Sequence, residues 1–252
     1  MIETLILSIV QGVTEFLPVS SSSHLILISE FVNFEKKSLS IDVSLHVGSF
    51  LAVVVYFYKD IINFFENREL FLKIIISSLP IMVLGVVLVQ TNLIDQLRNL
   101  KIIGWMTLVF GILLYIGDKS KSTRNLKNNF SYKSAIIIGL FQIFSLIPGV
   151  SRMGISVTAA RILKFNRVDA GKISFLLSIP TLGAVSIFGF KNLIYSDDFS
   201  FSIMNLTGII LSFVFSIITI KYFLKFLEKF SLNAFVIYRI ILGLIIIIYS
   251  YL

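Results

Sequence analysis

The stretch that decides the fold is Q-G-V-T-E-F-L-P-V-S-S-S-S-H, at residues 11–24. It lies within an apolar segment, residues 4–29, and interrupts it with Glu15, Pro18, four serines and His24. Pro18 ends the first helix because it lacks an N–H and clashes with the preceding turn, yet proline suits the first turn of a new helix. The segment is therefore expected to form two short helices joined by a break.

The rest of the chain is too apolar for a water-soluble domain. Its 252 residues are 56% hydrophobic and 14% charged, with a mean hydropathy of +0.93. A soluble globular domain carries about 25% charged residues. These values exclude cytosolic enzymes, DNA-binding proteins and disordered chains. The chain has no cysteine, which excludes a disulfide framework, a zinc-thiolate site and a thiol nucleophile.

Six further stretches are apolar enough to cross a bilayer, which takes about 20 mostly apolar residues. They are residues 43–58, 74–94, 102–117, 173–190, 199–220 and 233–252. A second broken segment, 134–160, is interrupted by Pro148-Gly149 and Ser151-Arg152. Irregular backbone at membrane depth is tolerated only inside protein or beside a wet cavity. The sequence predicts an all-α integral membrane protein with about six transmembrane helices and two re-entrant helical hairpins.

The two halves of the chain have the same order of features. A shift of 130 residues places Pro18 on Pro148 and Ser21 on Ser151, and one broken segment followed by three spans occurs in each half. Because three crossings are an odd number, the second copy is inverted relative to the first. We predict a single membrane domain, 1–252, whose inverted-topology repeats cover about 1–117 and 134–252 around a loop at 118–133. In such folds the site lies where the broken helices meet.

Basic residues predict the orientation. Fourteen Lys and Arg lie in the loops 59–69, 118–133, 161–172 and 221–230, whereas only five lie in the opposite segments 30–41, 95–101 and 191–202. By the positive-inside rule the first set is cytoplasmic, so both termini face outward. The net charge of +8 is then explained by topology, and no nucleic-acid partner is expected.

The first hairpin brings ionisable and hydroxyl groups to membrane depth, where such groups are expensive and functional by default. Gln11 and Glu15 are four residues apart and share a helix face. A helix that starts among the serines points its free N–H groups at a ready anion site. Ser21 and His24, three apart, are expected on one face beside Glu15, an arrangement suited to nucleophilic or acid–base chemistry. Gln11, Ser20, Ser22 and Ser23 are predicted to bind the substrate.

The second hairpin adds a cation. The guanidinium of Arg152 matches phosphate oxygens in a bidentate manner, and Gly149 and Gly154 allow close approach of the backbone. The sequence therefore predicts phosphate chemistry, with Gly149, Ser151, Gly154 and Ser156 in substrate binding. A purely structural Glu15–Arg152 ion pair is the alternative. For His46, the other histidine, a role in packing or in supporting the residues of the site is favoured.

The two hairpins together resemble those of the undecaprenyl-diphosphate phosphatase family, the bacitracin-resistance phosphatases. The resemblance continues through L-H-V-G-S-F-L-A-V-V-V at 45–55, A-G-K-I-S-F-L-L-S-I-P at 170–180 and Y-R-I-I-L-G at 238–243. It implies an enzyme of the bacterial plasma membrane that removes the terminal phosphate of undecaprenyl diphosphate, a polyprenyl diphosphate lipid. This reaction recycles the lipid carrier of peptidoglycan synthesis and confers resistance to bacitracin. A homodimer is left open.

The family motifs fall on particular residues of this chain. The E/Q-x-x-x-E motif falls on Gln11 and Glu15, and the serine and histidine of the family fall on Ser21 and His24. P-G-x-S-R ends at Arg152, so the resemblance implies catalytic roles for Glu15, Ser21, His24 and Arg152. It also implies a divalent cation, Mg²⁺ or Ca²⁺, bridged mainly by the substrate phosphates. Because the family often has Glu where this chain has Gln11, Glu15 is the one anionic metal ligand expected.

The mechanism is open at this point. Ser21 attacks the terminal phosphorus in one version, with His24 and Glu15 moving protons and Arg152 stabilising the transferring phosphoryl group. In others, His24 or water is the nucleophile. A site that opens to the outer face of the membrane is expected. A different class, a transporter or flippase of a phosphorylated lipid anion, is also compatible with inverted repeats and broken helices.

Overall fold

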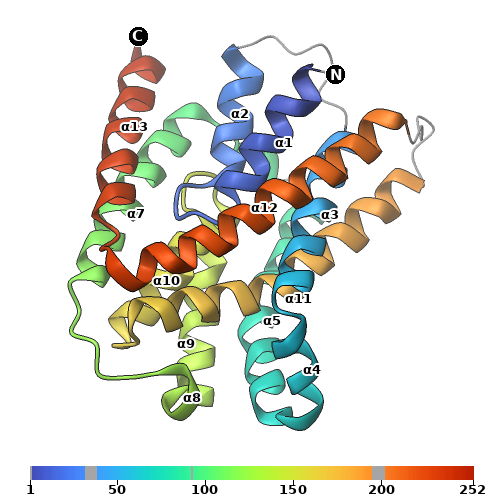
Figure 1. The fold of residues 1–252 in the computed structure, drawn as a ribbon. Coiled ribbons are helices and arrows are strands. Elements are labelled where there is room, and N and C mark those ends of the chain that lie inside the picture. The colour runs from blue at the N-terminus through green and yellow to red at the C-terminus, as the bar shows by residue number, and fades with distance from the viewer. Residues whose placement is uncertain (1, 32–38, 92, 195–201) are drawn as a thin grey trace.

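The structure, a computed structural model, describes residues 2–31, 39–91, 93–194 and 202–252, and these form a bundle of helices (Figure 1). The first half holds α1 (Ile2–Thr14), α2 (Ser21–Phe31), α3 (Leu39–Tyr56), α4 (Tyr58–Glu66), α5 (Arg68–Gln90), α6 (Leu93–Gln96) and α7 (Leu100–Asp118). The second holds α8 (Leu126–Asn129), α9 (Tyr132–Gln142), a 3-10 turn (Ile143–Leu146), α10 (Arg152–Ile162), α11 (Arg167–Ile194), α12 (Ile203–Lys229) and α13 (Asn233–Tyr251). Within these ranges no β-strand forms.

Five of these helices are long and apolar enough to cross a membrane, namely α5, α7, α11, α12 and α13. The helices α3 and α4 are bent by 71° at the break between them and make a sixth span if they are counted as one broken span. The predicted all-α fold with about six spans is confirmed. The bend lies at Phe57, which is 3% exposed. The sequence predicted a span at 43–58 without indicating its shape.

Both predicted broken segments consist of short helices joined by a break. The first break separates α1 from α2, and the second separates the 3-10 turn from α10. Ser20 and Ser151, the residues just before α2 and α10, have φ angles of 74° and 71°. Such values are uncommon for residues other than glycine. Ser151 also caps α10, since its Oγ accepts a hydrogen bond from Gly154 N at 3.1 Å.

The helices of the two halves follow each other in the same order. α1, α2, α3, α5 and α7 are matched, about 130 residues later, by α9, α10, α11, α12 and α13. The packing follows the same pairs: α3 lies against α12 as α11 lies against α5, and α7 lies against α13. Helices of each half thus pack on the other half (Figure 1). The limits of the repeats stay a prediction.

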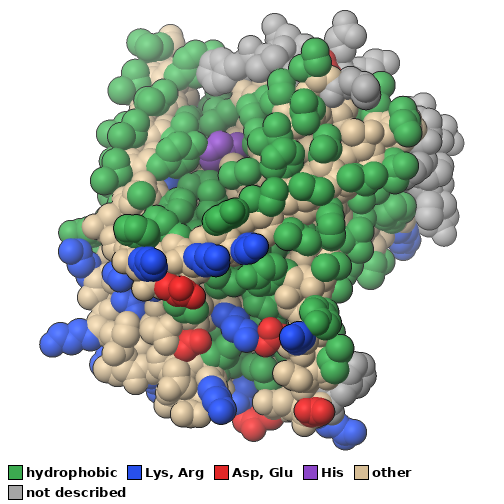
Figure 2. All heavy atoms as spheres, in the orientation of Figure 1, with side chains coloured by type: hydrophobic (Ala, Val, Ile, Leu, Met, Phe, Trp, Pro, Cys, Tyr) green, Lys and Arg blue, Asp and Glu red, His purple; other side chains and the backbone are tan. Residues whose placement is uncertain are grey.

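Apolar side chains cover the outside of the bundle, and hydroxyls lie between its helices. Val83, Ile187 and Ile248 are 62%, 74% and 61% exposed, and Figure 2 shows apolar side chains over most of the upper part of the molecule. Between α3 and α12, the fully buried Ser49 Oγ lies 3.1 Å from Ser212 Oγ. Small and hydroxyl residues are typical of helix contacts in bilayers, where lipid covers the outside.

Charged side chains gather at the end of the bundle that holds α4 and α8 (Figure 2), whereas α1 begins and α13 ends at the opposite end (Figure 1). The centre of the charged end is Asp118, which is 4% exposed. Its carboxylate accepts hydrogen bonds from Arg167 Nε at 2.7 Å and Arg167 Nη2 at 3.0 Å, and from Leu232 N at 3.1 Å. Asp118 thereby ties the end of α7 to α11 and to the start of α13.

Asp118→Asn is expected to lower the free energy of unfolding by about 3 kcal/mol. Asp118 Oδ1 also lies 3.4 Å from Arg161 Nε, both side chains are 3% exposed, and removing one partner of a buried ion pair leaves the other uncompensated. The matched control is Asp60→Asn, whose partner Lys172 Nζ lies 2.6 Å away in a half-exposed pair. Exposed pairs contribute no more than about 1 kcal/mol. Thermal unfolding in detergent should separate the two variants. Equal unfolding temperatures would contradict this account of the charged end.

Candidate active site

The two breaks meet inside the bundle beside a cavity of about 590 Å³. Its polar wall is formed by the first break and the start of α10. Its apolar wall is formed by α5 and α11. The polar wall includes Glu15, Ser20, Ser21, Ser22, Ser151 and Arg152. The two hairpins were expected to bring an acid, a hydroxyl and a guanidinium together. Glu15, Ser21 and Arg152 do line the same cavity.

Glu15 is the centre of the polar wall, and its side chain is 8% exposed. Arg152 Nη2 donates to Oε1 at 2.9 Å, so the pair joins the two halves of the chain. Ser21 Oγ donates to Oε2 at 2.6 Å, and Gln11 Nε2 donates to the same oxygen at 3.2 Å. A serine hydroxyl bonded to a carboxylate beside a guanidinium has the parts of a phosphoryl-transfer site: a nucleophile, a proton acceptor and a charge-stabilising group.

The breaks also contact each other through the backbone. Gly149 N donates to Ser20 Oγ at 3.3 Å, and Ser20 Oγ lies 3.0 Å from Ser23 Oγ. The φ of 102° at Gly149 favours glycine, and an added Cβ would lie 2.7 Å from Ile103 O. This contact holds the first turn of α2 close to the first turn of α10. Helix N-termini attract anions, so both suit a diphosphate.

His24 does not lie where the sequence predicted. Its Nδ1 donates to Ser20 O at 2.7 Å, because a carbonyl only accepts. Its Nε2 therefore accepts from the Tyr238 hydroxyl, and the two rings stack with centroids 5.8 Å apart. His24 is not among the residues that line the cavity. The sequence predicted Ser21 and His24 on one face of a helix beside Glu15; in the structure the imidazole is bonded to Tyr238 on α13 and does not line the cavity.

The histidine in the cavity wall is His46, on α3. Its Nδ1 donates to Asp42 O, one turn earlier, at 2.8 Å. Asp42 itself lines the same cavity. The sequence favoured a packing or supporting role for His46, and its place in the wall was missed because the side of α3 that faces the site is set by packing against α11 and α12.

No role was predicted from the sequence for Arg239, which falls within the motif Y-R-I-I-L-G at 238–243. Arg239 is fully buried on α13. It donates to four backbone carbonyls, from both breaks and from α7: Thr107 O at 3.3 Å, Pro18 O at 3.1 Å, Val150 O at 2.9 Å and Gly149 O at 2.8 Å. One guanidinium thus holds the two breaks together. The signal was available, because an ionisable group within a span is a functional candidate by default.

The other predicted substrate-binding residues lie behind the wall. Gln11, Ser23, Gly149, Gly154 and Ser156 do not line the cavity. A Cβ at Gly154 would lie 3.0 Å from Arg239 Nη1, so this glycine makes room for the guanidinium. Ser156 is fully buried, and its Oγ has no hydrogen-bond partner within the described ranges. These five residues shape the breaks from within the protein.

The donor set does not fit a resident metal ion. In the part of the chain that the structure describes, no three His, Asp or Glu side chains form a group that could hold one. Both oxygens of Glu15 already accept hydrogen bonds from Arg152, Ser21 and Gln11. Glu15 could serve as a ligand only by giving up one of these partners. The divalent cation therefore stays a prediction.

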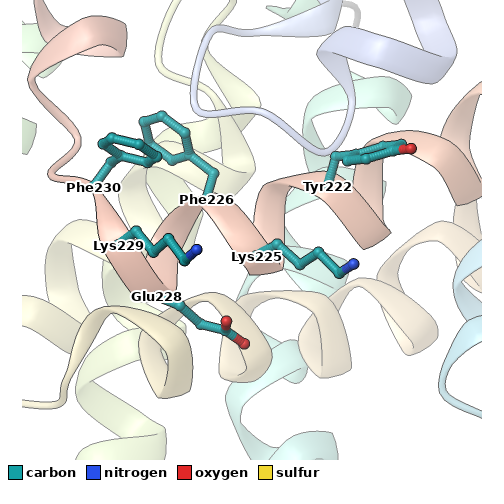
Figure 3. Close-up of a pocket in the computed structure, with 6 residues that line it drawn as sticks. All are labelled: Tyr222, Lys225, Phe226, Glu228, Lys229 and Phe230. Atoms are coloured by element: carbon teal, nitrogen blue, oxygen red, sulfur yellow. The ribbon is translucent and has the colours of Figure 1, made fainter.

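A second hollow, of about 540 Å³, lies on the surface at the charged end of α12. Figure 3 shows its lining, which comes from one helix and its C-cap: Tyr222, Lys225, Phe226, Glu228, Lys229 and Phe230. Among the described side chains, no hydroxyl donates a hydrogen bond to Glu228, whereas Ser21 donates one to Glu15 in the larger cavity. The candidate active site is therefore the interior cavity.

The comparison with protein families agrees with this site. The sequence model of the family described as Bacitracin resistance protein BacA matches residues 4–245. The chain belongs to this family. The match to the BacA family includes both hairpins and Arg239, so every residue of the polar wall lies within it. The resemblance predicted from the two hairpins is confirmed.

Individual relatives match along the whole chain. A protein named undecaprenyl-diphosphatase from Pelagibacter ubique (strain HTCC1062) is 51% identical over 251 residues, which cover 99% of this chain and 98% of the relative. Proteins of the same name from Jannaschia sp. (strain CCS1) and Saccharophagus degradans (strain 2-40) are 35% and 38% identical. They cover 98% and 94% of this chain, and 97% and 93% of the relatives.

Proposed function

We propose that this protein is an integral-membrane phosphatase that hydrolyses undecaprenyl diphosphate to undecaprenyl phosphate and inorganic phosphate. The hydrogen bond of 2.6 Å from Ser21 Oγ to Glu15, opposite Arg152, carries the proposal. The site lies in a cavity with apolar walls, which suits a lipid with a charged head. The reaction regenerates the lipid carrier for peptidoglycan synthesis, and resistance to bacitracin follows from membership of the BacA family.

The first chemical step uses Ser21 as nucleophile. Its Oγ attacks the terminal phosphorus while its proton moves to Glu15 Oε2, the oxygen to which it is already bonded. Arg152 and the first turns of α2 and α10 stabilise the charge on the transferring phosphoryl group. Undecaprenyl phosphate leaves, and water then hydrolyses the phosphoserine. The version with His24 as nucleophile has less support, because both of its ring nitrogens are engaged outside the cavity wall.

The apolar wall indicates where the polyprenyl chain lies. Ile81 and Val86 on α5 face the cavity, as do Leu182, Val185 and Phe188 on α11. Val86 and Val185 are 45% and 48% exposed, so this wall extends to the lipid-facing surface. The diphosphate can then remain in the polar part of the cavity while the tail stays in hydrocarbon.

The cavity opens toward the outer face of the plasma membrane in our proposal. Arg98, in the loop before α7, and Gly189, late in α11, line it, and both belong to the ends of the spans with few basic residues. Figure 2 shows the basic side chains at the other end of the molecule. The positive-inside rule supports a cytoplasmic location for that end, and hence termini on the outside.

Phosphate release from undecaprenyl diphosphate by the purified protein in detergent tests this function. We expect release that falls at least about tenfold with a chelator and returns on adding Mg²⁺ or Ca²⁺, because a cation bridged by substrate phosphates leaves with the chelator. The same ions should leave the unfolding temperature unchanged when substrate is absent, since the described residues include no group of side chains that could hold a metal ion. Binding of the lipid without phosphate release would contradict the phosphatase function and favour a carrier.

A further inference from the structure

His46 has one ring nitrogen without a role in the fold. Because Nδ1–H donates to Asp42 O at 2.8 Å, the neutral ring has its lone pair on Nε2. Nε2 has no hydrogen-bond partner among the described residues. The ring is half-buried in the wall of the cavity that also holds Glu15, Ser21 and Arg152. An oriented imidazole with a free lone pair beside a reaction site is suited to accept a proton.

The proposed reaction lacks a proton acceptor for its second half. In the first half Glu15 takes the proton of Ser21, to which it is bonded. Glu15 must return that proton when Ser21 Oγ leaves phosphorus, so it cannot also take one from the attacking water. His24 is engaged through both nitrogens outside the wall. The other charged groups that line the cavity are Asp42, Arg98 and Arg152.

The elements packed against α3 bring no competing base to the cavity. α3 lies against α1, α11 and α12. From α11 the lining side chains are apolar or hydroxyl, α1 contributes Thr14, and α12 contributes none. Asp42 lies on α3 itself, and its side chain is half-exposed. Among the described side chains that line the cavity, His46 is the one imidazole.

We propose, on the basis of the function proposed above, that His46 Nε2 is the general base of phosphoserine hydrolysis. Water attacks the phosphorus of phosphorylated Ser21 and gives one proton to His46 Nε2, while the bond between phosphorus and Ser21 Oγ breaks. Ser21 Oγ recovers its proton from Glu15, and inorganic phosphate departs. The imidazolium of His46 then returns its proton to water in the cavity. The cycle consumes one water and leaves every side chain as it began.

The test compares rapid-mixing kinetics of the wild type with those of His46→Asn. Asparagine places its amide N–H near the position of Nδ1, so it can keep the bond to Asp42 O while removing Nε2. We expect a fast burst of about one undecaprenyl phosphate per enzyme, followed by turnover slowed about 10²- to 10⁴-fold, the usual contribution of a general base. Phosphoserine should accumulate, the acid limb of the rate–pH profile should disappear, and added imidazole should restore turnover to His46→Ala.

His24→Asn is the matched control, because His24 also donates from Nδ1 to a carbonyl four residues earlier. It should produce no burst, and imidazole should not raise its rate, because no step of the proposed reaction uses His24. His46→Asn with wild-type turnover and pH profile would overturn the proposal. Slow turnover of His46→Asn without a burst would also overturn it, as would a His46→Ala protein whose turnover imidazole does not restore. If His46→Asn fails to fold, the imidazole experiment on His46→Ala is the deciding test. A wild type that releases no phosphate would overturn the proposed function itself, which separates the two failures.

Discussion

Ser21→Ala is expected to lower the rate of phosphate release by about 10³-fold or more, while the protein still binds undecaprenyl diphosphate. Loss of a nucleophile removes the covalent route entirely. Among the described hydroxyls, only that of Ser21 is hydrogen-bonded to Glu15, so no other serine is placed to replace it. Initial rates of phosphate release at saturating substrate measure the effect.

The control for Ser21→Ala is Thr14→Val, a change of similar size in the same cavity. The Thr14 hydroxyl donates to Val10 O at 2.6 Å and is therefore occupied within its own helix. This variant should stay within about threefold of the wild type, the range expected when no transition-state contact is lost. Ser21→Ala with more than a tenth of the wild-type rate would contradict serine attack. In a carrier that needs only an anion site, Ser21→Ala should leave transport of the lipid largely unchanged.

Arg239→Ala is expected to cause the largest loss of stability of any single change on α13, about 4 kcal/mol or more. Four buried carbonyls lose their donor, and a buried acceptor left without a partner costs about 1–3 kcal/mol. The two breaks lose their shared support, so phosphate release should fall as well. Thermal unfolding in detergent and the phosphate assay measure the two effects.

Ile241→Ala on the same helix is the control for Arg239→Ala. Ile241 lies two residues away and is 53% exposed toward lipid, so its truncation should change the unfolding temperature little. Arg239→Lys should fall between the two, because an ammonium supplies three donors from one point whereas the guanidinium supplies five in a fork. If Arg239→Ala has the unfolding temperature and the activity of the wild type, the two breaks keep their structure without this guanidinium and the account is wrong.

The parts of the fold that sequence predicted are those that the bilayer dictates. Uncharged stretches of about 20 residues must become helices, because backbone groups find no partners in lipid. Pro18 and Pro148 disfavour a continued helix and are followed by serines or glycine, so the breaks were predictable as well. Proline alone does not end a helix here, since Pro80 and Pro180 lie inside α5 and α11. The approach of Glu15 to Arg152 followed from the same reasoning, since each is too costly at membrane depth without the other.

The parts that sequence missed depend on how a helix is rotated by its neighbours. His24 and His46 each donate from Nδ1 to a carbonyl four residues earlier, and nothing local distinguishes them. Tyr238 on α13 holds His24 away from the cavity, whereas the packing of α3 turns His46 toward it. Arg239 was missed for a related reason, because all four of its acceptors come from other helices or breaks.

Trapping the covalent intermediate tests the central claim, that the two breaks assemble one site in which Glu15 activates Ser21 opposite Arg152. The protein is mixed with undecaprenyl diphosphate labelled in its terminal phosphate, quenched within one turnover in acid and, in a parallel sample, in base, and digested for mass spectrometry. The account predicts an acid-stable label on Ser21 that is absent from Arg152→Ala and from Glu15→Gln. A label on His24 that survives base but not acid, or wild-type turnover with no labelled residue at all, would contradict it.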